Sequence, residues 1–230
     1  MSEPRTIVVL QPGYLPWLGF FDQVRRADAF VVYDDVQFDK NGWRNRNRIK
    51  SANGPQWLTV PVLQRGRSKQ ALVDVEINAE VPWARRHLAS IRQNYARAPF
   101  LDHYLPELEE LLMRPWKRLV DLDLELAERM CGWLGIACEW VRSSELGIEG
   151  DRVGRLIAIC ETLGAERYLS GDAARDYLDE TAFAARSIEV SYQEYSHPTY
   201  PQLHGDFESN LSALDLLFNC GGESGQILRG

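Results

Sequence analysis

The sequence predicts a three-layer α/β fold with a mostly parallel sheet and a helical insertion in the middle of the chain. At both ends of the chain, short apolar runs rich in β-branched residues alternate with stretches of helical period, as parallel strands and their crossover helices do. Between these ends, apolar residues repeat with helical spacing over about residues 82–134. We therefore expect a single α/β domain over residues 1–230, in which this stretch forms a helical subdomain.

The N-terminal part predicts a β-α-β unit. Residues 6–10 (TIVVL) have the pattern of a buried strand, and residues 29–33 (AFVVY) have the same pattern and lead into Asp34. The helix between them places Trp17 and Phe20 on one face. This order predicts parallel pairing through a right-handed crossover, which makes the sheet Rossmann-like.

The middle of the chain begins with two expected strands and continues with helices. Residues 56–63 (QWLTVPVL) and 72–77 (LVDVEI) read as strands, and Pro61 places the first of them at a sheet edge or ends it early. Apolar stripes of helical spacing then begin near Trp83 and Leu101, and a third begins near Leu119.

The C-terminal part returns to alternation. Glycines directly follow the last leucines of two helices, at Gly135 and Gly164, where a left-handed cap is expected. The expected order is a strand (CEWVR), a helix (DRVGRLIAICET), a strand (RYL), a further strand (SIEVSYQEY) and a final helix over residues 211–218.

Composition restricts the function classes. The net charge of −7 and the pI of about 5.2 disfavour nucleic acid and anionic lipid as partners. No apolar run has the length of a membrane span, and the N-terminus lacks the basic region of a signal peptide, so we expect a cytoplasmic protein. The four cysteines form no C-x-x-C pair, which disfavours a zinc site, and a reactive thiol at Cys220 stays open.

Polar clusters follow almost every expected strand. The carboxyl ends of parallel strands share one edge of the sheet, and ligands bind in the crevice at that edge. Loops that converge there predict a binding site, although polar loops are also usual around any parallel sheet. The clusters are Gln11 to Tyr14, Asp34 with Asp35, Ser143 with Ser144, Ser170 to Asp172, and residues 195–202 (YSHPTYPQ).

Asp34 and Asp35 leave the second strand as neighbours, so their side chains should point in opposite directions. A single functional carboxylate is therefore expected, and Asp34 is the candidate because it lies nearer to the buried strand. It would act as a general base or hold a divalent cation with a phosphate. The alternative is a structural carboxylate that accepts hydrogen bonds from loop or helix-start amides.

The run WRNRNRIK places Arg44, Arg46 and Arg48 on one side of an extended segment, with Asn45 and Asn47 on the other. Guanidinium forks suit phosphate and carboxylate groups, such as those of a nucleotide-linked sugar or a phosphopantetheine. The alternative is that these arginines pair with nearby carboxylates.

His197 lies in a loop at the expected ligand edge and is the better acid/base candidate, because His87 shares a helical stripe with Trp83. The chain has no H-E-x-x-H, G-x-S-x-G, Walker or G-x-G-x-x-G motif. The usual hydrolase, nucleotide-triphosphatase and dinucleotide assignments therefore have no sequence support.

Five stretches in order resemble the WbqC-like protein family: QPGYLPWLGFFDQ, FVVYDDVQFDKNGWRNRNRIK, QWLTVPV, RYLSGDAARDYL and YPQLHGDFESNLSALDLLFNCGG. The resemblance implies transfer of glycine or another aminoacyl group onto a sugar amine during O-antigen or related polysaccharide synthesis. Relatives often carry a histidine before the first Gln-Pro, where this chain has Leu10. The family's polar signature falls on Gln11, Tyr14, Trp17, Asp34, Asp35, Gln37, Asn45, Arg46, Asn47, Ser170, Gly171, Tyr177, Tyr200, Gln202, Ser212, Asp215 and Asn219.

The leading hypothesis is thus an acyl or aminoacyl transferase that acts on an amino sugar or a similar small amine, with an acyl carrier protein as a further expected partner. It requires no cofactor. One alternative is a metal-dependent nucleotidyl- or glycosyl-type transferase that uses Mg²⁺, and another is a non-catalytic binding protein. The expected catalytic residues are Asp34 and His197, and the expected substrate-binding residues are Gln11, Tyr14, Trp17, Asp35, Gln37, Arg44, Asn45, Arg46, Ser170, Gly171, Tyr177, Tyr200 and Gln202.

Overall fold

The computed structural model describes residues 4–40, 42–67 and 69–230, and the chain divides into two compact units. Unit 1 consists of Met1–Gln11, Asp22–Asp35 and Ala137–Ser196. Unit 2 consists of Pro12–Phe21, Val36–Ile136 and His197–Gly230. Each unit is therefore assembled from three separate stretches of the chain.

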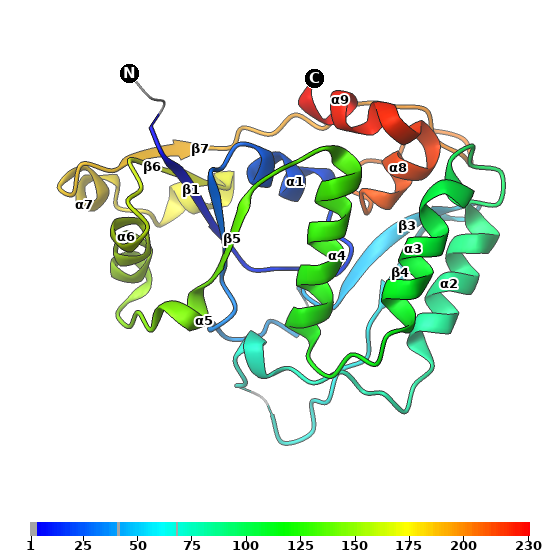
Figure 1. Cartoon of the computed structure of the whole chain (residues 1–230), viewed down its shortest axis with the longest axis horizontal. Coiled ribbons are helices and arrows are strands. Elements are labelled where there is room, and N and C mark those ends of the chain that lie inside the picture. Colours follow the sequence, from blue (N-terminus) through cyan, green and yellow to red (C-terminus); the bar gives the residue numbers. More distant parts are fainter. Residues whose placement is uncertain (1–3, 41, 68) are drawn as a thin grey trace. The chain divides into compact units, whose positions relative to one another are not determined.

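Unit 1 is built on a five-stranded sheet in which every neighbouring pair is parallel (Figure 1). The order β5-β2-β1-β6-β7 places β1 in the centre, and the chain reverses its direction across the sheet between β1 and β6. The parallel sheet that the sequence predicts is confirmed. Its strands are β1 (Thr6–Leu10), β2 (Ala29–Val32), β5 (Glu139–Arg142), β6 (Arg167–Ser170) and β7 (Glu189–Tyr192).

Helices cover both faces of this sheet. Right-handed crossovers put α1 (Leu18–Arg25) and α6 (Arg152–Thr162) on opposite faces, because β2 lies on one side of β1 and β6 on the other. On the α6 face, Ile7 and Val31 of the strands form a buried core with Ile159 of α6 and with α7 (Glu180–Ala184). This is the predicted three-layer α/β arrangement. A short helix, α5 (Ser143–Leu146), follows β5 directly.

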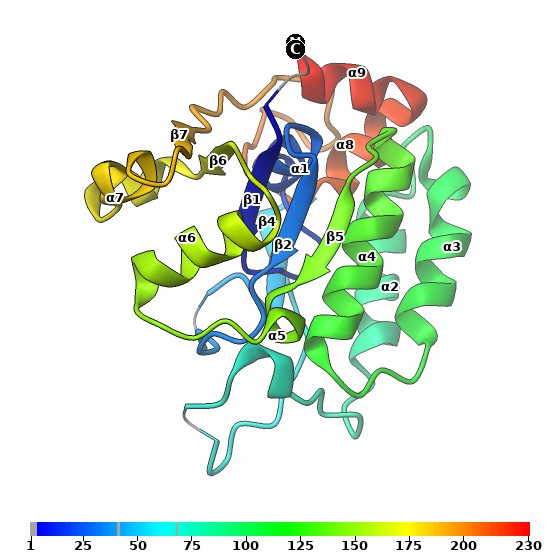
Figure 2. The same cartoon turned by 60° about the vertical axis from the view of Figure 1, so that its left-hand side comes forward.

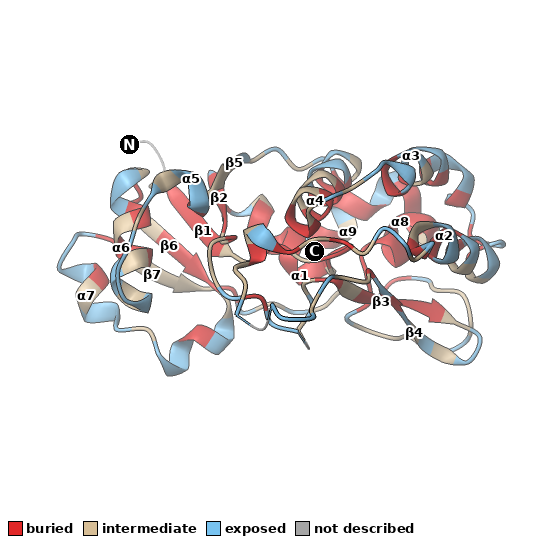
Figure 3. Ribbon diagram, turned by 90° about the horizontal axis from the view of Figure 1, so that it is seen from below, coloured by how far each residue is buried: buried red, intermediate tan, exposed pale blue. Residues whose placement is uncertain are grey.

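Unit 2 combines helices with one antiparallel hairpin, formed by β3 (Arg46–Ser51) and β4 (Gly54–Thr59). Figure 2 shows its three long helices beside one another, and Figure 3 shows that their inward sides are buried. Aromatic rings hold the helices together: the rings of Tyr95 and Phe218 lie 5.1 Å apart, and Tyr104 and Trp133 lie 5.2 Å apart. The helices are α2 (Trp83–Asn94), α3 (Leu101–Met113), α4 (Leu119–Leu134), α8 (Leu214–Cys220) and α9 (Ser224–Arg229).

Two of the predicted elements differ in the structure. Residues 72–77 form a 3₁₀ turn, Leu72–Asp74, followed by isolated bridges, so the predicted strand is wrong. The segment does not form a strand because the bridges pair it with two different segments, around Val62 and around Arg118, and with no continuous partner strand. The helix predicted over residues 211–218 begins three residues later, at Leu214, and it is not the final one, because α9 follows it.

Other local predictions hold. Strand β4 ends at Thr59, ahead of Pro61, and Gly135 and Gly164 both adopt a left-handed backbone with φ of 66°. The arginine-rich run after Trp43, expected as an extended segment, forms strand β3. Among the described residues, no helix has both the length and the apolar character needed to cross a membrane.

Candidate functional site

The residues that the sequence predicts for a site divide between the two units. Their convergence on one crevice stays a prediction. Unit 1 contains Gln11, Asp34, Asp35, Ser170, Gly171 and Tyr177, and unit 2 contains Tyr14, Trp17, Gln37, Arg44, Asn45, Arg46, His197, Tyr200 and Gln202.

Asp34 is fully buried at the carboxyl end of β2, and both of its carboxylate oxygens are occupied. Nε of Arg142 donates to Oδ2 at 3.0 Å, and the backbone N–H of Ser144 donates to Oδ1 at 3.0 Å. The Ser144 hydroxyl lies 3.0 Å from Oδ2. These contacts describe a carboxylate that joins the end of β2 to the start of α5. They match the structural alternative for Asp34, and its role as a base stays a prediction.

Asp34 and Asp35 do not point apart as strand geometry predicts. The Ser143 hydroxyl lies 3.2 Å from an oxygen of Asp34 and 2.6 Å from an oxygen of Asp35, so both carboxylates face the same side chain. The reason is that β2 ends at Val32, and the N–H of Asp34 turns back to donate to the Val32 carbonyl at 3.0 Å. The alternation of a strand therefore no longer applies at these two positions.

A cluster of arginines and tyrosines lies beside Asp35, and we name Tyr33, Asp35, Arg152, Arg155 and Tyr177 the carboxyl-edge cluster. Nη2 of Arg155 donates to Oδ2 of Asp35 at 2.5 Å, and the Arg155 guanidinium lies 5.1 Å from the Tyr33 ring. The Arg152 guanidinium stacks on Tyr177 at 3.4 Å from the ring centre. Tyr177 is 41% exposed, so a solute can reach this stacked pair.

The cluster gathers at the carboxyl ends of the strands. Tyr33 follows β2, Arg152 begins α6 after β5, and Tyr177 ends the 3₁₀ turn that follows β6. Gln11 and Gly171 follow β1 and β6, the two strands between which the sheet order reverses. In open α/β sheets, ligands bind at that reversal. Ser170 is buried and shares a hydrogen bond with the Tyr168 side chain.

Sequence reasoning missed Tyr33, Arg152 and Arg155, although a signal was present. The positive end of a helix dipole favours acidic residues in the first turn, yet the first turn of α6 has none and carries two arginines. Only the N-cap Asp151 opposes them, by accepting a hydrogen bond from the N–H of Gly154 at 2.7 Å. Cations placed against the local preference of a helix indicate a functional site.

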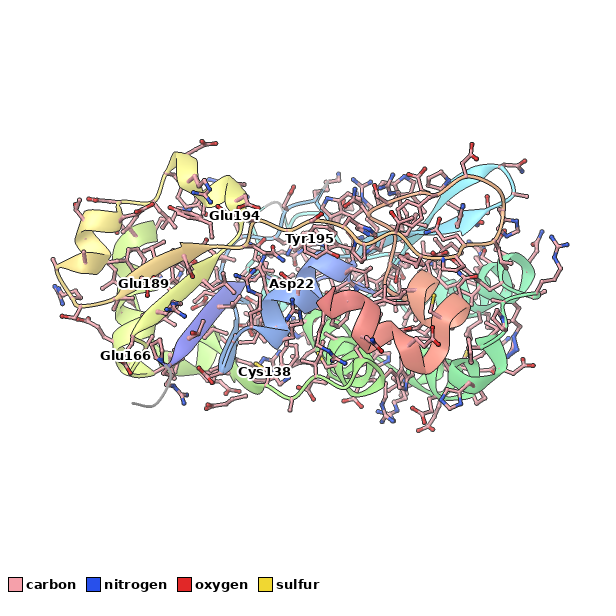
Figure 4. The ribbon with its side chains drawn as sticks, turned by 90° about the horizontal axis from the view of Figure 1, so that it is seen from above. Asp22, Cys138, Glu166, Glu189, Glu194 and Tyr195 are labelled. Atoms are coloured by element: carbon pink, nitrogen blue, oxygen red, sulfur yellow. The ribbon has the colours of Figure 1, made fainter. Side chains whose placement is uncertain are left out.

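A second polar network in unit 1 ties α1 to the segment after β7. The Gln193 side chain donates to Asp22 at 2.9 Å and accepts from Gln23 at 2.8 Å. Asp22 also forms an ion pair with Arg25 at 2.7 Å, and Figure 4 shows Tyr195 close to it. Burial and the nearby Asp22 raise the pKa of Tyr195. The network braces the loop that leaves β7.

In unit 2, the loop Pro12 to Tyr14 packs on the backbone of Trp43 and Arg44. The N–H of Tyr14 donates to the Arg44 carbonyl at 3.0 Å, and Nη1 of Arg44 donates to the Pro12 carbonyl at 3.0 Å. A β-carbon on Gly13 would lie 2.8 Å from the Trp43 carbonyl oxygen, so this contact requires glycine. The two sequence motifs QPGY and WRNRN therefore form one structural element.

Tyr14 itself is fully buried and forms a 2.9 Å hydrogen bond with Nδ1 of His87. Burial lowers the pKa of His87 to about 4, so the ring is neutral at pH 7, while a hydrogen bond with the Thr59 backbone opposes this shift. Tyr14 is thus a core tyrosine with a satisfied hydroxyl. Its expected contact with substrate stays a prediction.

Asp123 of α4 is the most unusual buried residue of unit 2. Its side chain has no exposed area, and neither carboxyl oxygen has a hydrogen-bond partner among the described residues. Burial raises the pKa of Asp123 well above its usual range, while the charge of Arg44 opposes that shift. Burial raises the pKa of Tyr14, and the nearby Asp123 raises it further.

The sequence contains a signal for Asp123. It lies four residues after Leu119 and three before Leu126, both on the apolar stripe of its helix. A carboxylic acid on the apolar stripe of a helix is expected to be buried. Helical spacing alone could therefore have identified Asp123 from the sequence.

The hairpin separates its asparagines from its arginines, as the alternation predicts. Asn45 and Asn47 are buried and donate to the carbonyls of Val60 and Leu15, at 2.8 and 2.7 Å. Arg46 and Arg48 point to the other face of β3. The expected substrate contact of Asn45 has no support in these contacts, because its amide holds the backbone.

Asp215 of α8 organises a buried network under the C-terminal loop. It accepts from the Tyr95 hydroxyl and from the Gln202 amide, both at 2.7 Å, and it shares a hydrogen bond with Tyr200. Nζ of Lys50 donates to Oε1 of the Gln202 side chain at 3.0 Å. Tyr200 and Gln202, expected as substrate ligands, thus connect the loop to α2, α8 and β3.

Three further predicted residues have structural contacts. His197 lies half-buried between Tyr200 and Phe207, its Nδ1 is 2.8 Å from the Pro198 carbonyl, and burial lowers its pKa. Trp17 pairs with Ser212 through a β-bridge, and Gln37 pairs with Ala71 in the same way. None of these contacts decides whether the residues also bind substrate.

Cys220 is buried, and burial together with the nearby Asp215 and Glu223 raises the pKa of its thiol to about 11. A thiol with so high a pKa is a poor nucleophile, so the structure gives no support to a reactive Cys220. Among the described residues, no group of three or more His, Cys, Asp or Glu side chains could hold a metal ion.

Sequence comparisons agree with the resemblance. The family model described as the WbqC-like protein family matches residues 11–227. The uncharacterized protein Rv1507c of Mycobacterium tuberculosis (strain ATCC 25618 / H37Rv) is 37% identical over 227 residues, which are 98% of this chain and 98% of that protein. No solved structure is significantly similar to the chain.

Proposed function

Because the chain belongs to the WbqC-like protein family, we propose that it transfers an acyl or aminoacyl group, such as glycine, onto an amino sugar or similar small amine. The reaction class follows from what the family resemblance implies for O-antigen and related polysaccharide synthesis. The donor would be a carrier-protein thioester or a nucleotide-activated acyl group. Both donor types carry phosphate.

The carboxyl-edge cluster of unit 1 is the observation that carries this proposal. Arg152 and Arg155 project from the first turn of α6, and each guanidinium lies over a tyrosine ring. Arginine forks bind phosphate oxygens in a fixed geometry, and the exposed ring of Tyr177 can stack on the base of a nucleotide. The cluster also lies at the edge where α/β sheets bind nucleotides. These properties match a phosphate-bearing donor.

The transfer itself needs a nucleophile and a proton acceptor. The amine nitrogen bonds to the acyl carbon, and the bond from that carbon to the thioester sulfur or phosphate oxygen breaks. A base takes a proton from the amine, and the leaving group is released as a thiol or phosphate. Asp34 is a weak candidate for the base because Arg142 and Ser144 occupy its oxygens. His197 is the other candidate, and burial lowers the pKa of its ring.

Binding measurements test the donor site. Calorimetry with coenzyme A, AMP and ATP should detect binding, and Arg152→Ala should weaken it about tenfold, equivalent to about 1.4 kcal/mol. Arg167→Ala is the matched control. Arg167 forms an ion pair with Glu189 at the amino ends of β6 and β7, away from the carboxyl-edge cluster. Equal affinity of the Arg152 variant and the wild type for every phosphate compound would refute the donor site.

A product assay tests the reaction class. The protein is incubated with an aminoacyl thioester of a carrier protein and with glucosamine-type amines, and mass spectrometry looks for the amide. Formation of the amide in the presence of a chelator supports acyl transfer without a metal. Transfer of a nucleotidyl or glycosyl group that stops on chelation would support the Mg²⁺-dependent alternative instead.

A further inference from the structure

The outer face of the hairpin in unit 2 carries four side chains that we name the Trp–Arg platform: Trp43, Arg46, Arg48 and Trp57. The rings of Trp43 and Trp57 lie 5.0 Å apart at an angle of 37°. Trp43 is 43% exposed and Trp57 is 44% exposed, which is unusual for the largest apolar side chain. The two rings pack against each other at a tilt, and part of each ring stays open to solvent.

Both arginines lie against these rings. The Arg46 guanidinium is 4.5 Å from the Trp57 ring centre, and that of Arg48 is 5.6 Å from Trp43 and 5.8 Å from Trp57. Arg48 stands directly opposite Trp57 in the hairpin register, and Arg46 lies two residues away on the same face. The platform therefore follows from the pairing of β3 with β4.

The sequence alternative for the arginines was pairing with nearby carboxylates, and Arg48 does not follow it. Among the described residues, Arg48 has no ion pair, its Nε–H has no hydrogen-bond partner, and Nη2 makes one long contact of 3.4 Å with the Asn210 carbonyl. Asp35, a carboxylate close to this run in the sequence, pairs with Arg155 instead. The Nε–H is buried, so Arg48 can offer an anion only the hydrogens of its two terminal nitrogens.

The platform is also held rigidly from behind. Ile49 and Leu58, on the opposite face of the hairpin, are buried, and Asn47 donates to the Leu15 carbonyl at 2.7 Å. At the far end of the same face, Lys50 is buried under the Gln202 loop. A surface whose rings are fixed before the ligand arrives loses little conformational entropy on binding.

We infer that the Trp–Arg platform binds a sugar that carries a phosphate or diphosphate, in the form of a nucleotide-linked or phosphorylated amino sugar. The apolar face of a pyranose ring packs on an exposed indole, and the guanidinium forks reach the adjacent phosphate oxygens. Nucleic acid fits less well, because the whole chain has a net charge of −7 and would repel an extended polyanion. This inference rests on the proposed function in one respect: the bound sugar is the amine acceptor.

Tryptophan fluorescence tests the platform directly. Titration with UDP-glucosamine, glucosamine 1-phosphate, UDP and glucosamine should quench emission. The sugar phosphates should bind at least tenfold more tightly than glucosamine, and UDP-glucosamine more tightly than UDP. If UDP binds as tightly as UDP-glucosamine, or if glucosamine binds as tightly as its phosphate, the inference is overturned.

Variants locate the binding, which is then measured by calorimetry because they alter the fluorophores. Trp57→Ala and Arg48→Gln should each weaken binding of the sugar phosphate at least tenfold. Arg129→Ala is the control, since Arg129 pairs with Glu107 on the helices of the same unit. Trp57→Leu keeps an apolar side chain at this position without the ring. Circular dichroism of every variant checks that it is folded. Unchanged affinity in both Trp57→Ala and Arg48→Gln overturns the inference.

The result is separable from the donor site. Intact sugar-phosphate binding together with no amide product counts against the proposed function and leaves the platform standing. Amide formation with no effect of Trp57→Ala or Arg48→Gln on acceptor affinity counts against the platform alone.

Discussion

Asp123 and Arg44 interact electrostatically inside unit 2, yet neither oxygen of Asp123 accepts a hydrogen bond from any described residue. Burial lowers the pKa of Arg44 and raises that of Asp123, so burial disfavours the charged form of each group. A buried carboxyl without a partner destabilises the fold. Its presence in the apolar stripe of α4 indicates that stability is not the reason for this residue.

The first prediction concerns this carboxyl. Asp123→Asn keeps the shape and cannot ionise, so we expect the free energy of unfolding at pH 7 to rise by about 1–3 kcal/mol. Folding raises the pKa of Asp123, so the protonated carboxyl contributes stability to the fold. This contribution is fully present below pH 3.8, the ordinary pKa of an aspartic acid, and it is lost as the pH rises. The difference in the free energy of unfolding between variant and wild type should therefore be small near pH 3.8 and increase at higher pH.

Urea denaturation of both proteins at several pH values measures this gap. Asp121→Asn, two residues away on the partly exposed side of the same helix, is the control. A constant difference across the pH range would show that the Asp123 carboxyl is not the origin of the effect.

Asp34 gives the second prediction. Asp34→Asn removes the charge of a fully buried carboxylate that pairs with the partly exposed Arg142, so we expect a loss of about 3 kcal/mol in the free energy of unfolding. If Asp34 is only an anchor, the folded fraction keeps its turnover number. A fall of more than about a hundredfold in that number, measured where the variant is fully folded, would identify it as the base instead.

The pH–rate profile gives the third prediction. Burial lowers the pKa of His197 below its ordinary value of 6.5. A base must be neutral to accept a proton, so kcat/KM should fall on the acidic side only below pH 6.5, as His197 becomes protonated. His197→Gln should remove this limb and lower kcat about a hundredfold. A profile with the same acidic limb in the variant would exclude His197.

The fourth prediction concerns the contact of the first loop with Trp43. Gly13→Ala places a β-carbon 2.8 Å from the Trp43 carbonyl oxygen, so we expect a loss of about 1–3 kcal/mol in unfolding free energy. Gly132 in α4 is a matched control, because a β-carbon there meets nothing within 4 Å. Gly132→Ala should instead stabilise the protein by about 0.5–1 kcal/mol. Thermal unfolding of the two variants should move in opposite directions.

Much of unit 1 could be predicted from the sequence, because its strands are short apolar runs whose neighbours in the sheet follow from handedness. The pattern 6–10, 29–33 and 167–170 marks buried strands directly. Residues 72–77 have the same composition but lack a continuous partner strand, and composition alone does not reveal the absence of a partner.

The site was predictable in part. Strand ends identified Asp34 and Asp35, and the family resemblance identified Tyr177. Whether a carboxylate is available depends on distant partners such as Arg142 and Ser144. Those partners lie more than a hundred residues away, and although Ser144 was singled out as a strand-end residue, its hydrogen bond to Asp34 has no local signal. Tyr200, Gln202 and Asp215 were all named from the sequence, and only the structure shows that the two loop residues connect to the buried Asp215.

The interleaved path of the chain affects how the protein can be made. The central strand β1 pairs with β6, which is synthesised more than half the chain later, and unit 2 needs its last stretch from His197 onward. Contacts between such distant segments form slowly, because a long loop must close first. Neither unit can therefore be expressed as one continuous fragment, and the edge of β1 that pairs with β6 stays unpaired until about three-quarters of the chain has been translated.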